Sequence, residues 1–288
     1  MGLFKSTIRR IGGPTNPATL RILDAADWFR RLWADRLLEP PVPFLNPERS
    51  LLVIWSAKCA CTVVYVWYLQ SVGQLEAFRR SGLSAHAFRG QRYAKSDLFR
   101  RGKARMLDDY RIVHVIRDPC LRAVSAYRHE LATGYADKRF SAAGLGPMDH
   151  NSGFSFSRYL EYLETVDLSR ANVHHKQQFH PVEKVKAADR VINISRQDLF
   201  TELNRLESEH GMPRTDFTAL DWLHRKEDAR RARTVSFARG GVADLPFDAA
   251  AARGRAPWPD YEQFLGPSVR RRIERLYATD FEAFGEHL

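Results

Sequence analysis

A short polar segment between two apolar stretches, Ala57-Lys58-Cys59-Ala60-Cys61-Thr62, is the first place where the residue types could do chemistry. It lies at the expected turn from a strand into a helix, where backbone N–H groups and the helix dipole attract an anion. Lys58 would add a positive charge to that site, and Thr62 a hydroxyl donor. The segment lacks the glycines and the Gly-Lys-Ser/Thr ending of an ATP-type phosphate loop, which disfavours a kinase or ATPase of that kind.

The cysteines of this segment have two other interpretations. Cys59 and Cys61 could be two ligands of a metal, but no second cysteine pair completes a zinc site, so no metal is expected. They could also be small packing residues of a buried turn. The chain has 3 cysteines, and an odd number in a long chain favours a reducing compartment over a disulfide framework.

A second candidate begins at Arg117 and runs to Ser125 in the segment Arg-Asp-Pro-Cys-Leu-Arg-Ala-Val-Ser. Arg117 follows an apolar run, while Asp118 can cap a helix and Pro119 fits its first turn. Ser125 then lies about two turns into that helix. A guanidinium and a hydroxyl that converge near a strand end suit a phosphate group. The alternative is an arginine–aspartate surface pair followed by ordinary polar helix residues.

Three apolar runs are placed to position these segments. Leu51–Trp55, Ile112–Ile116 and Val191–Ile194 have the composition of strands covered on both faces, and a helix-like stretch follows each of them. Strands that alternate with helices predict an α/β fold, a P-loop-NTPase-like doubly wound parallel sheet flanked by helices. Ligands of such sheets bind at the carboxyl ends of the strands, where both candidate segments should lie.

The chain divides into an N-terminal appendage and one large unit. Residues 1–40 are expected to form an amphipathic helical segment, and residues 41–288 a single α/β domain. The Pro-rich stretch from Pro40 to Pro47 separates the two parts. Glycines and a proline predict a loop over residues 133–153. One amphipathic helix is expected to start near Pro267 and to continue through Phe284.

The composition is that of a globular protein with a surplus of positive charge. The 288 residues include 45 Lys and Arg against 34 Asp and Glu, a formal net charge of +11. This surplus favours an anionic partner, which could be nucleic acid, a membrane surface, a nucleotide or an acidic sugar. The absence of a helix-turn-helix pattern and of an RNP-like aromatic strand disfavours nucleic acid. No apolar run has the roughly 18–20 residues that a membrane span needs.

The first segment resembles the phosphosulfate loop of the sulfotransferases that use 3′-phosphoadenosine 5′-phosphosulfate (PAPS). The likeness is to the Golgi carbohydrate sulfotransferases, whose loop reads Pro-Lys-x-Ala-Cys-Thr. Lys58, Ala60, Cys61 and Thr62 match that loop, and Ala57 replaces its proline.

Three more parts of the chain resemble the same family. Its 3′-phosphate motif has an Arg, a Pro two residues on and a Ser eight residues after the Arg, a spacing that Arg117, Pro119 and Ser125 reproduce. His174 and Gln178 are similar to its His-Trp-x-Pro-Gln segment, without the Trp and the Pro. Residues 273–285 resemble its C-terminal Tyr-x-x-Asp-Phe-x-x-Phe-Gly pattern. The likeness therefore runs from about residue 50 to residue 285.

The resemblance implies a PAPS site that needs no metal. Arg239, in an Arg-Gly-Gly sequence, could be a reduced version of the Arg-Lys-Gly loop that closes over the nucleotide in related enzymes; a plain glycine turn is the alternative. His174 and Gln178 are the expected substrate-binding residues. The expected donor-binding residues are Lys58, Cys59, Ala60, Cys61, Thr62, Arg117, Ser125 and Arg239.

The implied reaction is transfer of a sulfuryl group from PAPS to a hydroxyl of a carbohydrate-type acceptor, with release of PAP. The acceptor would be a polysaccharide, a glycolipid or a glycosylated small molecule. Lys58 would stabilise charge on the leaving phosphate. Arg117 and Ser125 would hold the 3′-phosphate, which distinguishes PAPS from ATP.

A general base should remove the acceptor proton, and histidine is the usual residue for this role. Related enzymes often take it from between the two motifs, where His86 and His114 are the choices. We prefer His86, which is expected near a strand end, because a histidine in mid-strand such as His114 is more often a core residue. His174 and His175 are the competing choice.

Two other functions remain open from the sequence, a nucleotide kinase with a degenerate phosphate loop and a basic protein that binds nucleic acid or a membrane surface. The Golgi relatives have a transmembrane anchor that is not found here, and the composition is rich in Arg and Ala. Both features favour a bacterial cytoplasmic enzyme. Its N-terminal segment could rest on a membrane if the acceptor is a lipid, although packing on the domain is the commoner use.

Overall fold

The computed structural model describes residues 38–105, 110–135, 137–145, 152–218, 234–237 and 241–288. The N-terminal amphipathic segment therefore lies almost wholly outside the described residues, and so does Arg239. Within the described ranges, no helix combines the length and the apolar character needed to cross a membrane.

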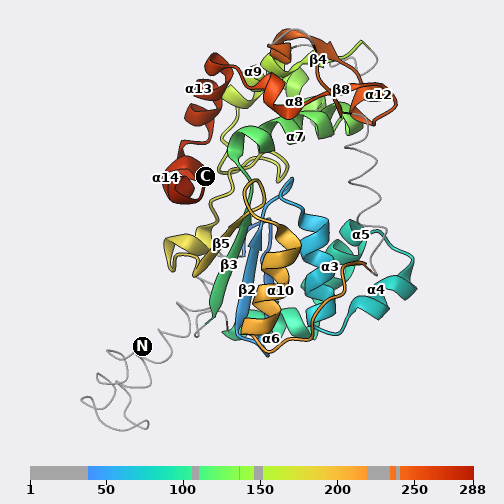
Figure 1. Cartoon of the computed structure of the whole chain (residues 1–288), viewed down its shortest axis with the longest axis vertical. Helices are drawn as coiled ribbons and strands as arrows, with labels where there is room; N and C mark the ends of the chain where they lie inside the picture. The colour runs from blue at the N-terminus through green and yellow to red at the C-terminus, as the bar shows by residue number, and fades with distance from the viewer. Residues whose placement is uncertain (1–37, 106–109, 136, 146–151, 219–233, 238–240) are drawn as a thin grey trace, which may run out of the picture.

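A four-stranded sheet lies at the centre of the fold, in the order β1-β2-β3-β5 (Figure 1). Strands β2 (Leu51–Trp55), β3 (Arg111–Ile116) and β5 (Arg190–Asn193) are parallel, so the strands predicted from the three apolar runs are confirmed. The edge strand β1 (Phe44–Asn46) pairs antiparallel with β2. Strand β1 was not predicted because it lies within the Pro-rich stretch, yet all of its residues are buried.

Successive side chains of β3 enter different cores, because they point to opposite faces of the sheet. Val113 and Val115 pack in the core on the side of α3 (Cys61–Ser71). Ile112 packs on the other side, and His114 contacts the ring of Phe284 with centroids 5.2 Å apart. Helices therefore flank both faces of the sheet, as the predicted α/β fold requires.

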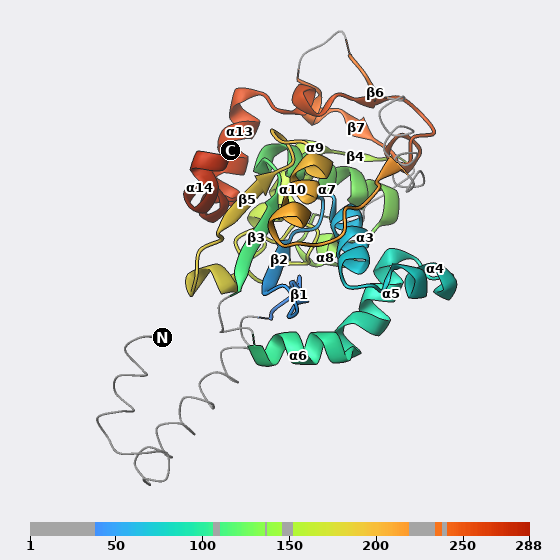
Figure 2. The same cartoon turned by 60° about the horizontal axis from the view of Figure 1, so that its bottom comes forward.

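The helices beside the sheet follow its strands in the chain. Helix α3 comes directly after β2 and is apolar all round, so its residues 63–69 are all buried. Of the next three helices, two lie beside α3 and the third packs on β1 (Figure 2). The elements of this group are α4 (Leu75–Ser81), α5 (Ala85–Arg92), η1 (Tyr93–Lys95), α6 (Asp97–Arg105), η2 (Pro181–Lys184) and α10 (Leu199–Glu209).

A second group of elements lies beyond the carboxyl end of β3 (Figure 1). Helix α7 (Pro119–Thr133) leads into it, with the Asp118 carboxylate accepting a hydrogen bond from Leu121 N and with Pro119 in the first turn, as predicted. Tyr127 and Trp258 lie in its aromatic core. The other elements are α8 (Asp137–Ala142), β4 (Phe154–Ser155), α9 (Phe156–Glu164), β6 (Thr234–Val235), η4 (Val242–Asp244), β7 (Pro246–Phe247), α12 (Ala249–Ala252), β8 (Trp258–Pro259), η5 (Tyr261–Phe264) and α13 (Pro267–Leu276). The last two elements, α14 (Ala278–Phe284) and η6 (Gly285–His287), return to the sheet, where Phe284 contacts His114 and the carbonyl oxygen of His287 accepts from Asn193 Nδ2.

Two expectations from the sequence are wrong in part. The loop predicted over residues 133–153 contains helix α8, because Phe140 is fully buried and stacks on Tyr162 with ring centroids 4.2 Å apart. The single C-terminal helix is two helices, α13 and α14, which meet at Tyr277. The Tyr277 hydroxyl is buried and donates to the carbonyl oxygen of His175 at 2.9 Å, so this residue fixes the break in the helix.

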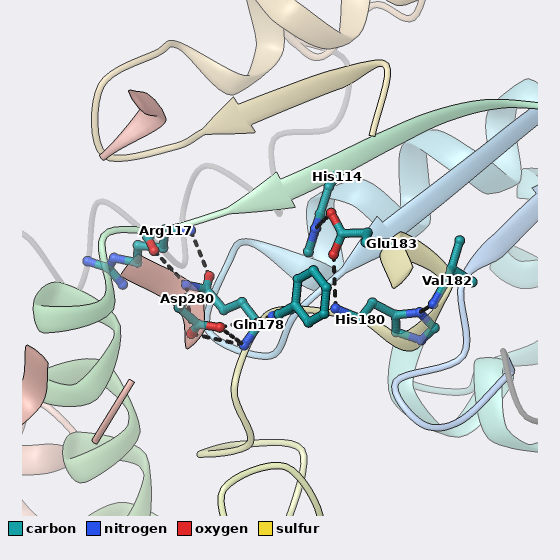
Figure 3. Close-up of polar contacts among 8 residues, drawn as sticks. His114, Arg117, Gln178, His180, Val182, Glu183 and Asp280 are labelled. Atoms are coloured by element: carbon teal, nitrogen blue, oxygen red, sulfur yellow. Dashed lines mark hydrogen bonds and ion pairs between the residues drawn. The ribbon is translucent and has the colours of Figure 1, made fainter. Parts of the chain in front are cut away.

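A buried polar chain follows the face of the sheet that carries His114 (Figure 3). His114 Nδ1 lies 3.0 Å from Glu183 Oε1, and Glu183 Oε2 accepts a hydrogen bond from His180 N at 2.9 Å. His114 is therefore a core histidine, as its mid-strand position predicts. Burial lowers the pKa of His180 to about 4, and burial together with Arg122 lowers the pKa of His175 to about 3. Both imidazoles are neutral in the folded protein at pH 7.

We expect the free energy of unfolding to fall as the pH drops from about 6.5 towards 4. The unfolded chain takes up protons on His175 and His180 near their ordinary pKa of about 6.5, whereas the folded protein does not bind them until the pH is much lower. Urea unfolding at several pH values should show a shallower decline for His180→Asn than for the wild type. The matched control is His287→Asn, whose side chain is exposed. Equal declines for wild type and His180→Asn would contradict this account of acid sensitivity.

Candidate active site

The loop between β2 and α3, residues 56–60, turns tightly at the carboxyl end of β2. Cys59 N donates to Ser56 O at 3.2 Å, and both Lys58 and Ala60 have left-handed backbone conformations, with φ of 72° and 53°. Residues with a Cβ adopt such values at a cost that the surroundings must offset. Ala60 is the N-cap of α3, so the unpaired N–H groups of the first helical turn come directly after the loop. The loop has the backbone geometry of an anion site without its usual glycines.

The two cysteines of this loop region differ in environment. Cys59 is fully buried, and its thiol donates to Gln178 Oε1 at 3.1 Å. Burial raises the pKa of Cys59 to about 12, so the thiol stays protonated at neutral pH. Cys61 is the first residue of α3 and is partly exposed. In the described part of the chain no group of His, Cys, Asp and Glu side chains could hold a metal ion.

Arg117 lies at the carboxyl end of β3, beside the β2–α3 loop. Its Nη1 donates to Lys58 O at 3.5 Å, and its guanidinium lies over the ring of Tyr261, 5.3 Å from the centroid. Its peptide groups are held by Gln178: Oε1 accepts from Arg117 N and Nε2 donates to Arg117 O, both at 2.9 Å (Figure 3). The two segments singled out in the sequence are therefore in contact in the structure.

Gln178 joins these segments to the C-terminal part of the chain. The Asp280 carboxylate accepts hydrogen bonds from Gln178 N at 2.7 Å and from Phe179 N at 2.9 Å, and Gln178 Nε2 lies 3.5 Å from the same carboxylate (Figure 3). Together with the contacts to Cys59 and Arg117, these contacts give hydrogen-bond partners to both Nε2 and Oε1 of the Gln178 side chain. Gln178 is 2% exposed. Its expected role in binding the substrate therefore needs correction, because the side chain holds other parts of the site in place.

Arg122 on α7 is a buried arginine that braces the same region. Its Nε donates to Ala57 O at 3.1 Å and its Nη2 to Lys176 O at 2.5 Å. The guanidinium lies over the ring of Tyr277, 5.7 Å from the centroid. Ser125, the proposed partner of Arg117, lies one turn further along α7 and is partly exposed. Arg122 ties the loop to the segment that carries the histidines at positions 174 and 175.

His174 lies in a group of aromatic rings close to positive charges. Its ring centroid is 4.2 Å from that of His129 and 4.8 Å from that of Tyr135. Burial lowers the pKa of His174 to about 4, helped by the charge of Lys58, by His86 in its protonated form and, more weakly, by two arginines. The structure thus brings His174, Lys58 and His86 within electrostatic range of one another. Nδ1 of His174 is buried and has no hydrogen-bond partner among the described residues.

His86 lies near the carboxyl end of β2, as expected, although it belongs to a helix: its ring contacts Arg89, whose guanidinium lies over Trp55, the last residue of β2. His86 lies in the first turn of α5, which begins at Ala85 after the Ser84 side chain accepts a hydrogen bond from Ala87 N. The ring is exposed, and its Nδ1 lies 3.3 Å from Nη2 of Arg89. The Ser-Ala-His-Ala-Phe sequence is thus an N-cap followed by the first turn of a helix.

A family model described as the sulfotransferase family matches residues 44–285. The chain belongs to the sulfotransferase family. Searches of curated proteins and of solved structures gave no match. The matched range contains the β2–α3 loop, the end of β3 and Asp280, and it agrees with the extent of the resemblance found in the sequence. The protein is therefore a sulfotransferase, an enzyme that transfers a sulfuryl group.

Two residues that adjoin the candidate site were not singled out from the sequence. Tyr261 contacts the Arg117 guanidinium from a short 3-10 turn 144 positions later in the chain. Arg89 lies over the ring of Trp55 at 4.1 Å from the centroid. The sequence showed Arg89 only as one of many basic residues between positions 79 and 105. Its position three residues after His86, on one face of a helix, was the available signal.

We expect Gln178→Ala to lower the free energy of unfolding of the sulfotransferase by about 2–3 kcal/mol. The change removes the partner of both peptide groups of Arg117 and the acceptor of the Cys59 thiol, whereas Asp280 keeps its hydrogen bonds from the backbone of residues 178 and 179. Urea unfolding measures the effect. Gln177→Ala is the matched control, because the neighbouring side chain is only partly buried and a loss below about 0.5 kcal/mol is expected. Equal losses in the two variants would show that Gln178 does not join the site.

Proposed function

We propose that this sulfotransferase transfers the sulfuryl group of PAPS to a hydroxyl of a carbohydrate-type acceptor and releases PAP. One observation carries the proposal: Lys58 and Arg117 lie side by side at the carboxyl ends of neighbouring parallel strands, with Arg117 Nη1 donating to Lys58 O at 3.5 Å. Two cations at that edge of an α/β sheet suit a nucleotide with phosphate groups at both its 3′ and 5′ positions.

The residues divide between the two ends of such a donor. Lys58, the first N–H groups of α3 and the Thr62 hydroxyl would bind the 5′-phosphosulfate. Arg117 and Ser125 would bind the 3′-phosphate. Among the described residues, the Arg117 guanidinium contacts a carbonyl oxygen and an aromatic ring, and it forms no ion pair with a carboxylate. This leaves its charge available for an anionic ligand.

We propose His174 as the general base in place of His86. Arg89 can only donate, so His86 Nδ1 accepts and the neutral ring carries its proton on Nε2. The lone pair of His86 is thus already used. The lowered pKa of His174 keeps its ring neutral at pH 7. A bound anionic donor would offset the charge of Lys58 and raise the pKa of His174 towards the working pH, where a base is most effective.

The proposed step is an in-line displacement at sulfur. The acceptor oxygen forms a bond to sulfur while its proton passes to His174. The bond between sulfur and the bridging oxygen of the 5′-phosphate breaks, and its electron pair stays on that oxygen, where Lys58 stabilises the charge. No oxidant, reductant or metal takes part in this balance.

The nature of the acceptor rests on the resemblance of the β2–α3 loop to that of the carbohydrate sulfotransferases. A polysaccharide, a glycolipid and a glycosylated small molecule all fall within the proposal. We also propose that the enzyme is bacterial and cytoplasmic, and that residues 1–40 can contact a membrane surface. Acceptor screening with sulfur-labelled PAPS is the direct experiment for this part.

Thermal-shift measurements with PAP and ATP test the donor. PAP is expected to raise the melting temperature of the wild type more than ATP does. If the protein is a nucleotide kinase, ATP should raise the melting temperature and PAP should not. Arg117→Ala should lose about 10- to 100-fold in PAP affinity, and both Lys58→Ala and Arg117→Ala should lose PAPS-dependent transfer. Lys95→Ala, at an exposed position in η1, is the matched control. Near-normal transfer by both active-site variants would rule out the donor assignment.

The base assignment predicts that His174→Asn lowers kcat by about 100-fold or more while the affinity for PAP changes little. His86→Asn should lose less, because its ring does not receive the proton. Steady-state kinetics at saturating PAPS and calorimetric titration with PAP make the two measurements. A larger loss of kcat in His86→Asn than in His174→Asn would restore His86 as the base.

A further inference from the structure

Arg89 lies over an aromatic ring at the carboxyl end of β2. Its guanidinium carbon lies 4.1 Å from the ring centroid of Trp55, the last residue of β2, and 6.0 Å from that of Tyr65 on α3. Contact with an aromatic face orients a guanidinium and leaves its N–H groups directed sideways. Arg89 is therefore a fixed cation rather than a mobile surface arginine.

The neighbours of Arg89 leave its positive charge without a carboxylate. Its interactions among the described residues are with His86 Nδ1 at 3.3 Å, with the Cys61 side chain and with the two rings. The exposed arginines elsewhere commonly pair with acids, as Arg79 does with Glu76. Burial of Arg89 also opposes its charged form and lowers its pKa. A half-buried cation with no internal acid suits an anionic ligand.

The position of Arg89 indicates which end of a PAPS molecule it would contact. Cys61 is the first residue of α3, so the guanidinium lies at the N-terminal turn of that helix, next to the β2–α3 loop. The charges of Arg89 and Lys58 both act on His174. Arg117, in contrast, contacts the loop at Lys58 O and lies against Tyr261. Arg89 thus belongs with the reacting end of the site, where the proposed base lies.

We propose that Arg89 is a catalytic residue that binds the non-bridging oxygens of the sulfuryl group during transfer. This inference rests on the proposed use of PAPS. In the displacement, the bond from the acceptor oxygen to sulfur forms as the bond from sulfur to the phosphate oxygen breaks. Arg89 neither gives nor takes a proton or an electron pair. Its planar fork holds two sulfuryl oxygens, and the Trp55 ring fixes the direction of that fork before the donor binds.

The test compares two nucleotides that differ only in the sulfuryl group. Arg89→Gln should weaken binding of PAPS by about 10-fold or more while the affinity for PAP stays within about 2-fold of the wild type. Both affinities are measured by calorimetry without acceptor, and melting temperatures check folding. Arg92→Gln, at an exposed position near the end of the same helix, is the matched control and should bind both nucleotides normally.

Arg89→Lys is the second variant, in case Arg89→Gln does not fold. Arg89→Lys keeps the charge and loses the planar fork. It should therefore also weaken the binding of PAPS more than that of PAP, although by less than Arg89→Gln does. Equal weakening of PAPS and PAP in either variant would overturn the inference, and so would unchanged affinity for both with a raised KM for the acceptor. Failure of the wild type to bind PAP would instead refute the proposed function, and the role of Arg89 with it.

Discussion

The site depends on one buried side-chain amide. Gln178 binds both peptide groups of Arg117, receives a hydrogen bond from the Cys59 thiol and contacts Asp280, so it links three segments that are far apart in the sequence. Each of these groups is buried or partly buried, and an unpaired polar group there would be costly. The relative position of the β2–α3 loop and the end of β3 is therefore fixed by requirements of hydrogen bonding, and any ligand that spans them finds the spacing already set.

Arg122 and Arg89 show two opposite uses of arginine near this amide. Arg122 is fully buried, and its N–H groups donate hydrogen bonds to the carbonyl oxygens of residues 57 and 176, so its charge stabilises the protein's own backbone. Arg89 is held by ring contacts, which occupy the face of the guanidinium and few of its N–H groups. The first arginine is a structural brace, and the second retains hydrogen-bonding capacity at the edge of the site.

Local sequence patterns predicted the main strands and helix starts. They did not predict the roles of side chains whose partners are far away in the sequence. The apolar runs predicted β2, β3 and β5, and the Asp118-Pro119 pair predicted the start of α7, because these signals act within a few residues. The role of Gln178 could not be predicted, since its partners lie 61, 102 and 119 positions away. The environment of His174 was hidden for the same reason. Helix α8 arose from burial of one aromatic side chain in a glycine-rich stretch.

The hydrogen bonds from the backbone of residues 178 and 179 to Asp280 make the site sensitive to loss of the C-terminal residues. Asp280 lies on α14, close to the end of the sequence, and it accepts hydrogen bonds from the backbone of residues 178 and 179. A chain that stopped before Tyr277, through an early stop codon or proteolysis, would retain Lys58, Arg117 and His174. Its Gln178 segment would nevertheless lose its anchor. The terminal helix thus supports the proposed donor site from a distance, and loss of binding after C-terminal trimming would not require damage to any residue proposed to touch the ligand.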